Sequence, residues 1–323
     1  MHRKLVGVFL ISAALACLAF QEYGWSQSAP YPTRQLTYLI PFDPGGQSDV
    51  EARRQQPHLS RILGQQVIID YKVGGGGALG WRELTRSKPD GYLFCGFNIP
   101  HTILQPLQQE VGYKTEQLVP VALFQRTPVG LAVPENSPYK TLAEFIQAAK
   151  KEPGKLSVGG SSFFSGPHFA TMLFDKLAGI KLSYVPFTGA APQITALLGG
   201  HTDAGMSFSN DLVRFKDKLR ILAMATEERM AEFPDVPTFR EQGFDIVEAV
   251  DRGVLVPPKT PKEIIAKLEA AFLEIAKDPG IQSEMKKQGF VPLAMGAAET
   301  KAYLDKLAAS YKAMFEEIKK TMK

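Results

Sequence analysis

Strand-like and helix-like segments alternate along the whole sequence, and this order constrains the fold more than any single residue does. Residues 35–41 and 66–71 are rich in β-branched and apolar side chains, as strands are, whereas residues 264–275 carry apolar side chains at helical spacing. Such alternation is typical of α/β folds, in which helices cover largely parallel sheets. The chain has 323 residues, a length that favours two domains over one.

The first predicted strand runs directly into a pair of glycines. Gly45 and Gly46 allow a sharp turn and leave their N–H groups unshielded, and Ser48 and Glu51 have the spacing of a capping box that would open the next helix. The loop and the positive end of the helix dipole would favour an anion such as a carboxylate or phosphate. A tight turn with nothing bound is the alternative. Pro57 lies inside the helical pattern and is expected to kink or split that helix.

The first 28 residues have the pattern of a secretory signal peptide. A cationic start at residues 2–4 precedes an uncharged apolar run over residues 5–20, and small or polar residues follow. The run is shorter than the roughly 20 residues needed to span a bilayer, so we expect export and cleavage, giving a periplasmic protein. Cleavage is expected after Ser28, with Ala19 and Ala29 as alternatives. Cys17 loosely matches a lipoprotein cleavage site, which makes lipid anchoring a further alternative.

Composition and charge exclude several classes of function. The net charge of +4 comes from 37 basic and 33 acidic residues without a dense basic stripe, so nucleic acid is not an expected partner. Cys95 is the only cysteine beyond the predicted signal peptide and therefore cannot form an internal disulfide. The G-x-S-x-G elbow of a hydrolase does not occur. The histidines beyond residue 28 are not spaced as a metal pair, so we expect neither a metal nor a cofactor.

Residues 75–80 contain the spacing G-x-G-x-x-G of a dinucleotide-binding loop. A nucleotide site would also require an acidic residue about 20 positions later, at the end of a second strand. The nearest candidate, Asp90, lies in a Pro-Asp-Gly turn instead. We therefore expect a tight glycine loop beside the ligand cleft. An exported, cofactor-dependent enzyme that uses Gly75 to Gly80 is the alternative.

Two further loops rich in glycine and hydroxyl side chains precede helices. Residues 159–166 offer glycine amides and three serine hydroxyls, and residues 186–191 again run into a helix. Together with Gly45 and Gly46, these loops place helix starts in both halves of the chain, which predicts a cleft that grips an anion from two sides. His101 and His168 each follow a strand end, where open α/β sheets bind their ligands. Structural turns without a ligand are the alternative.

The sequence at these positions resembles the extracytoplasmic solute-binding receptors of tripartite tricarboxylate transporters, also called TctC or Bug receptors. The matching motifs follow one another in order along the chain behind the predicted signal peptide. They are Tyr31-Pro32, Pro41-Phe42-x-x-Gly45-Gly46-x-x-Asp49, Leu63-Gly64-Gln65, Gly76-Gly77-x-x-Gly80, Pro89-Asp90-Gly91-Tyr92, Val185-Pro186-Phe187-x-Gly189, Gly199-Gly200-x-x-Asp203, Pro234-Asp-Val-Pro-Thr238 and Glu241-x-Gly243.

The resemblance implies the two-lobed, type II fold of periplasmic binding proteins, in which each lobe is a mostly parallel sheet flanked by helices. The first lobe would comprise residues 31–129 and 251–323, and the second lobe residues 130–250. Residues 127–130 and 249–253 would form the hinge between them. Ligand contacts to both lobes would then stabilise the closed state.

The resemblance also assigns ligand contacts to matching positions. The loop at residues 42–49 would hold one carboxylate. The loop at residues 161–168 would hold the other, together with residues 188 and 189. Asp203 would lie near the cleft. Arg252, a cation near the hinge, is a further candidate for a direct carboxylate partner. The expected ligand-binding residues are Phe42, Asp43, Gly45, Gly46, Ser48, Asp49, Asn98, His101, Ser161, Ser162, Phe163, Ser165, His168, Thr188, Gly189, Asp203 and Arg252.

This sequence departs from the commonest pattern of the family in three places. Asp43 and Pro44 replace the small residues usual before the glycine pair, and Thr188 stands where a lysine is frequent. The residues 251–253, Asp-Arg-Gly, replace a tryptophan-glycine pair. These departures leave the identity of the ligand open. Asp43 could disfavour a highly charged acid such as citrate, or it could simply cap its loop.

A chain of this family would be a receptor and not an enzyme. It would capture a small carboxylate by hinge closure, and the ligand could be a di- or tricarboxylate or an aromatic or aliphatic acid. It would deliver that ligand to one large and one small integral-membrane transporter subunit, and we expect it to be a monomer. An exported carboxylate sensor that acts with a two-component kinase is an alternative, beside the nucleotide-dependent enzyme described above.

Overall fold

The computed structural model describes residues 31–321, with side chains as far as residue 317. The chain divides into residues 1–33 and a compact unit of residues 34–323, which holds every helix and strand described below. The predicted signal peptide, its cleavage positions and Cys17 lie outside the described residues. Within those residues, no helix combines the length and the hydrophobicity that a membrane span requires.

The strands form two sheets that share strand β4. The first sheet has the order β2-β1-β3-β9-β4, with β10 also paired to β4, and the second has the order β4-β7-β5-β6, with β8 also paired to β4. The strands are β1 (Leu36–Ile40), β2 (Val67–Tyr71), β3 (Leu93–Ile99), β4 (Val119–Pro134), β5 (Ser157–Ser161), β6 (Ser183–Phe187), β7 (Ala204–Phe208), β8 (Leu219–Met224), β9 (Ala249–Val256) and β10 (Val291–Gly296).

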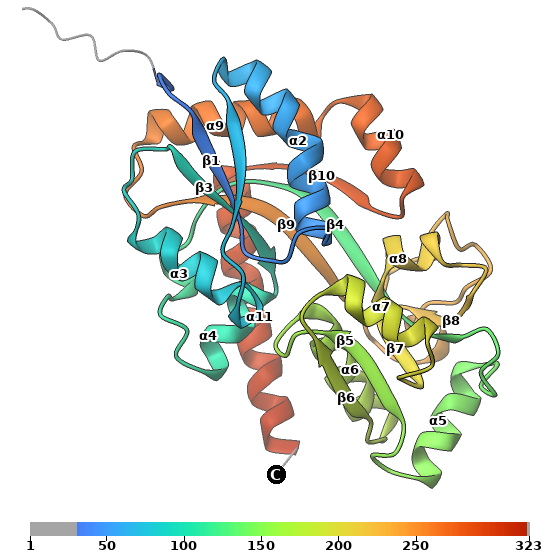
Figure 1. Cartoon of the computed structure of the whole chain (residues 1–323). Coiled ribbons are helices and arrows are strands. Elements are labelled where there is room, and N and C mark those ends of the chain that lie inside the picture. The colour runs from blue at the N-terminus through green and yellow to red at the C-terminus, as the bar shows by residue number, and fades with distance from the viewer. Residues whose placement is uncertain (1–30, 322–323) are drawn as a thin grey trace, which may run out of the picture. The chain divides into compact units, whose positions relative to one another are not determined.

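Each sheet contains a block of three parallel strands, β2-β1-β3 in the first and β6-β5-β7 in the second. β9 runs antiparallel to β3, and β4 runs antiparallel to β7. The long strand β4 continues from the first sheet into the second, as Figure 1 shows. Where it leaves the first sheet, Thr127 is paired with Val250 and Pro128 with Ala249. The predicted α/β fold is confirmed, with β4 as the continuous connection between its sheets.

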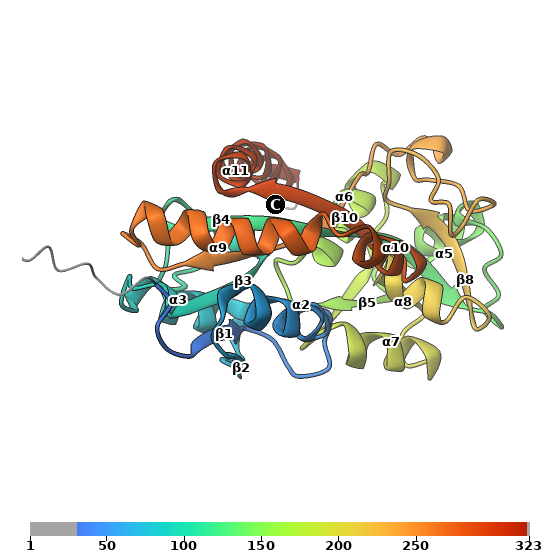
Figure 2. The same cartoon turned by 90° about the horizontal axis from the view of Figure 1, so that it is seen from above.

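Helices cover both faces of the first sheet (Figure 1). Successive side chains of a strand point to opposite faces. Tyr38 of β1 therefore contacts Phe272 of α9 and Gln55 of α2 on one face, while Leu39 joins the cluster of Trp81 from α3 on the other. The helices are α2 (Gln47–Leu63), α3 (Ala78–Arg86), α4 (His101–Gln108), α5 (Leu142–Lys151), α6 (Gly166–Ala178), α7 (Ala190–Leu198), α8 (Ser209–Arg214), α9 (Lys262–Ala276), α10 (Pro279–Lys287) and α11 (Ala297–Thr321). In Figure 2, seen from above, α9 lies across the first sheet.

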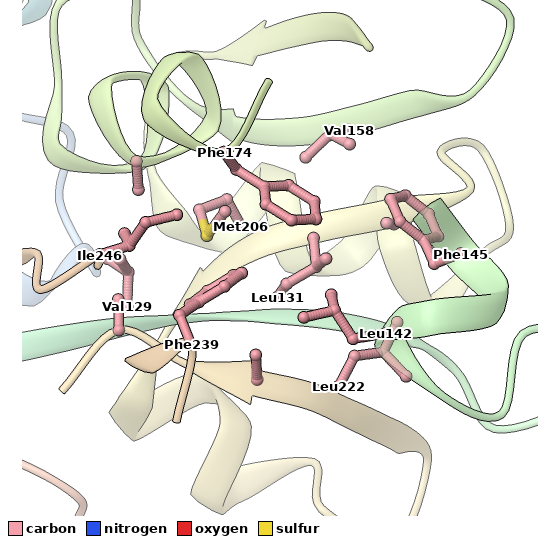
Figure 3. Close-up of a cluster of buried hydrophobic side chains, with 14 of the residues drawn as sticks. Val129, Leu131, Leu142, Phe145, Val158, Phe174, Met206, Leu222, Phe239 and Ile246 are labelled. Atoms are coloured by element: carbon pink, nitrogen blue, oxygen red, sulfur yellow. The ribbon is translucent and has the colours of Figure 1, made fainter. Parts of the chain in front are cut away.

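A separate hydrophobic cluster packs on the second sheet (Figure 3). The ring of Phe174 in α6 lies 5.2 Å from the ring of Phe239 and 5.7 Å from that of Phe244, measured between centroids. Leu131 of β4 and Met206 of β7 belong to the same cluster and are fully buried. Each sheet thus has its own core, which fixes the loops at its strand ends independently of the other sheet.

Two pairs in the sequence have the spacing of a capping box, Thr141 with Glu144 and Ser48 with Glu51; the structure confirms the first as a box and not the second. Thr141 and Glu144 form the capping box at the start of α5, with each side chain bound to the other's backbone. Ser48 and Glu51 do not form a box, because α2 begins one residue before Ser48 and its N-cap is Gly46. Glu51 is instead buried and accepts hydrogen bonds from the side chains of neighbouring α2 residues.

Pro57 does not split α2, although its position in the sequence made a split possible. The helix runs without interruption from Gln47 to Leu63. A proline inside a helix removes one backbone hydrogen bond. Here the buried side chains Leu59 and Leu63 continue the apolar face beyond Pro57 and keep the second half of the helix on the sheet.

Candidate ligand-binding site

The carboxyl ends of the parallel strands in both sheets meet at one cavity of about 290 Å³. Ligands of open α/β sheets bind at this end of the strands. The loop after β1, the end of β3, the end of β5, the loop after β6 and the end of β7 all contribute side chains, and Arg252 of β9 completes the wall. The predicted residues that line it are Phe42, Asp43, Gly46, Ser48, Asn98, His101, Ser161, Ser162, Thr188, Gly189 and Arg252.

The first loop is closed by its own backbone and by Asp49. Gly45 has a φ of +79°, a conformation that favours glycine, and its N–H donates to Asp49 Oδ2 at 2.7 Å. The N–H of Gly46 donates to the backbone oxygen of Asp43 at 3.2 Å. The two glycine amides are therefore not free for an anion, contrary to the expectation from the sequence. The free donors lie one step further on, since the first-turn amides of Gln47 and Ser48 have no acceptor within their helix.

The second loop is held by a hydroxyl–imidazole cluster behind the cavity wall. Ser165 is the N-cap of α6, and its Oγ accepts from the N–H of His168 and donates to the carbonyl of Ser161. His168 Nδ1 accepts from the N–H of Phe164 at 3.2 Å. Ser165 and His168 thus shape the loop, while Ser161 and its neighbour at position 162 face the cavity.

The third loop brings the start of α7 to the same cavity. Gly189 is the N-cap of this helix and has no side chain that could occupy the first-turn amides. Ala190, Ala191 and Pro192 follow it and line the cavity with Thr188. Apart from the proline, these residues present N–H donors and small side chains, which lets a ligand approach the backbone closely.

Arg252 is the cation of this cavity, and it is only 4% exposed. Its Nη1 donates to Thr127 Oγ1 at 2.6 Å, and its guanidinium lies 5.6 Å from the centre of the Phe208 ring. Burial lowers the pKa of Arg252 to about 10, while Glu51, Asp211 and Asp251 oppose that shift. Arg252 therefore stays protonated at neutral pH. Among the side chains of residues 31–317 no carboxylate forms an ion pair with it, and its Nε has no acceptor.

His101 is a second buried, nitrogen-containing side chain in the cavity wall, beside Arg252. Burial and the neighbouring Arg252 charge lower the pKa of His101 to about 3, so the imidazole is neutral. Its ring lies edge-on to the ring of Phe42, with 5.9 Å between centroids. The cavity consequently offers a neutral imidazole and one guanidinium.

Unpartnered polar atoms gather around this cavity. Gln47 Oε1, His101 Nδ1, Ser161 Oγ and Arg252 Nε are all buried without a hydrogen-bond partner within the described chain, and all four residues line the cavity. An unpaired buried polar group is costly, so such groups are rare and need an explanation. Their concentration at one cavity favours a polar ligand there, because such a ligand could pair with all four atoms.

The remaining predicted site residues do not line this cavity. Gly45, Asp49, Ser165 and His168 support the loops, and Phe163 lies beside them at the rim of a neighbouring cavity. Asp203 is at the opposite edge of its sheet, because it precedes β7, and its Oδ2 accepts from the N–H and Oγ of Ser157. Six further residues line the cavity without having been named as ligand contacts from the sequence, four of them inside the predicted loops 42–49 and 186–191: Pro44, Gln47, Ala190, Ala191, Pro192 and Phe208.

The glycine-rich residues 74–77 line a second cavity of about 280 Å³, which shares Phe42, Asp43, Ser162 and Thr188 with the first. This position, beside the cleft, is where the sequence predicted a tight glycine loop. The backbone approaches closely there, since a Cβ on Gly76 would lie 2.9 Å from Ser162 Oγ. No cluster of side chains suited to a metal ion occurs in the described part of the chain.

Comparison with known proteins agrees with this architecture. The sequence model of the tripartite tricarboxylate transporter family receptor matches residues 51–320. A UPF0065 protein of the gbd 5′ region in Cupriavidus necator is 30% identical over 319 residues, which cover 97% of this chain and 95% of that protein.

Two solved structures are also similar. A Rhodopseudomonas palustris protein with adipate has a TM-score of 0.83 and 26% identity, covering 90% of this chain and 98% of that one. MatC from Rhodopseudomonas palustris, with bound malate, has a TM-score of 0.80 and 27% identity, covering 89% of this chain and 99% of that one.

Proposed function

Because the chain belongs to the tripartite tricarboxylate transporter receptor family, whose members bind small carboxylates outside the cytoplasm and perform no catalysis, we propose that it captures such an acid in the cavity between its two sheets. The observation that carries this proposal is Arg252, a buried guanidinium without an ion-pair partner among the described side chains. The two similar structures with adipate and malate support a carboxylate ligand.

The carboxylate is held by donors from both sheets. Arg252 Nε supplies a charge-assisted hydrogen bond, and the first turn of α2 supplies the amides of Gln47 and Ser48 on the same side. Ser161 Oγ and the start of α7 after Gly189 supply donors from the second sheet. A ligand bound to both sets stabilises the closed arrangement, because only contacts made in one state shift the balance between two states.

The two lobes correspond to residues 31–129 with 251–323 and to residues 130–250, and they rotate about β4 and β9 where these strands pass between the sheets. Direct contacts already bridge the two sides. Gln47 Nε2 donates to Asn210 Oδ1 at 2.5 Å, and Ser209 Oγ donates to the carbonyl of Gly289 at 2.6 Å. Such contacts can form or break as the lobes move, while the paired strands remain intact.

Delivery requires a membrane transporter, with which receptors of this family work. We assign this chain a partner with one large and one small integral-membrane subunit. The protein would be exported by its signal peptide at residues 1–28 and act in the periplasm as a monomer.

Small-angle X-ray scattering tests closure. Addition of a carboxylate that binds should decrease the radius of gyration of the monomer, because lobe rotation removes solvent from the cleft. At an acid concentration close to the wild-type Kd, the radius of the Arg252→Ala variant should stay nearly unchanged, because this variant binds the acid more weakly. A radius that stays constant when calorimetry shows the wild-type protein to be saturated would contradict hinge closure, while leaving ligand binding itself intact.

A further inference from the structure

The charged side chains that line the cavity are few. Among the described side chains, Arg252 and Asp43 are the only charged ones in the cavity wall. His101 also lines it but is neutral. The carboxylates behind Arg252 already have partners. Glu51 pairs with Arg54, Asp251 pairs with Arg126, and Asp211 accepts from Gln47. One guanidinium is therefore available to one carboxylate of a ligand.

Asp43 belongs to the walls of both the first and the second cavity. Its side chain makes no hydrogen bond or ion pair within the described residues, and the loop is held by Asp49 instead. Asp43 is exposed, which also argues against a structural role. Its negative charge is thus unneutralised where the walls of the two cavities meet.

Among the described residues, the second cavity is lined by no cation that could receive a second carboxylate. Apart from Asp43, its wall is made of glycines, prolines, hydroxyl groups and apolar side chains. Val73 and Phe163 are 42% and 48% exposed, and both lie in this wall. Exposed large apolar side chains that face one cavity suit an apolar body more than a charged group, because covering them releases water.

We propose that this receptor selects acids with a single carboxylate and an apolar body, and that Asp43 is the residue that rejects a second carboxylate. This inference rests on the proposed function. The single carboxylate binds Arg252, and the body extends past Asp43 toward Val73 and Phe163. A dicarboxylate would have to place its second charge beside Asp43 without a cation, which costs both repulsion and desolvation.

The test is isothermal titration calorimetry with matched pairs of acids, hexanoate with adipate and 4-methylbenzoate with terephthalate. We expect the wild-type protein to bind the monocarboxylate of at least one pair about tenfold more tightly than its dicarboxylate. Asp43→Asn should strengthen dicarboxylate binding about fivefold and change monocarboxylate binding less than twofold, since one exposed like charge is removed. Asp217→Asn removes the same charge at an exposed position outside both cavities and should change neither.

The outcomes separate this inference from the proposed function. If wild-type protein binds the dicarboxylates as tightly as their partners, or if Asp43→Asn leaves the ratio unaltered, Asp43 does not select against charge and the inference falls. If Arg252→Ala still weakens all bound acids in that case, the carboxylate receptor stands. If neither member of either pair binds the wild-type protein, both the inference and the proposed site are contradicted.

Discussion

Replacing Arg252 with alanine should weaken carboxylate binding about 10- to 100-fold, since a charge-assisted hydrogen bond to a buried group contributes roughly 1.5–3 kcal/mol. The guanidinium is 4% exposed and its Nε has no acceptor within the described residues. Among the described residues, Arg252 is the only cationic side chain that lines the cavity, and alanine removes it. Calorimetric titration of both proteins with the same acid measures the loss.

Two further variants make this result specific. Arg252→Lys keeps the charge but loses the planar fork of donors, so its affinity should lie between those of wild type and Arg252→Ala. Arg86→Ala removes an exposed arginine at the end of α3 and should leave affinity within about twofold of wild type, because an exposed surface charge contributes little. Equal affinities for all four proteins, each with an unchanged circular dichroism spectrum, would remove Arg252 from the site.

Replacing Phe174 with alanine should lower the free energy of unfolding by about 3–5 kcal/mol, the usual cost of emptying a buried aromatic site. The Phe174 ring is fully buried and packs against the rings of Phe239 and Phe244 in the core of the second sheet. Other members of this cluster, among them Leu131 of β4 and Met206 of β7, are held in strands and cannot collapse fully into the space. Urea denaturation followed by circular dichroism measures the change.

The control for this variant lies on the same helix. Leu177 is 46% exposed, so Leu177→Ala should change the free energy of unfolding by no more than about 0.5 kcal/mol. Both variants alter α6 by loss of an apolar side chain, and they differ in burial. A loss below about 1 kcal/mol for Phe174→Ala would show that the second sheet is not stabilised by this cluster.

Local patterns in the sequence predicted the strand ends that build the site. The predicted loops at residues 159–166 and 186–191 follow the ends of strands, as the loop after residues 35–41 does, and parallel pairing aligns these ends within each sheet. Thr141 and Glu144 could be identified as a capping box because both partners lie within one helical turn. The departure at positions 251–253 drew attention to Arg252, which lines the cavity.

The parts that could not be predicted depend on burial, on which acceptor each loop amide finds, and on contacts between segments far apart in the sequence. Ser48 and Glu51 have the spacing of a cap, but burial of Glu51 beside Arg54 shifts the helix start. The sequence indicates a free backbone amide at Gly45, whereas in the structure this N–H donates to the Asp49 carboxylate. The resemblance places Asp203 near the cleft. Asp203 instead directly precedes β7, so it lies at the amino-terminal edge of the sheet, away from the cavity at the carboxyl ends of the strands. No local sequence pattern identifies Gln47 as a site residue, because its side chain lines the cavity and donates to Asn210, a residue far away in the sequence.

The most direct measurement is a crystal structure of the protein with a tightly bound acid, identified by a thermal-shift screen of mono-, di- and tricarboxylates. The acid should lie between the two sheets, with a carboxylate oxygen within hydrogen-bond distance of Arg252 Nε and the first turn of α2. A tightly bound solute outside this cavity, or one inside it with no acid group, would contradict the assignment of this site to a carboxylate.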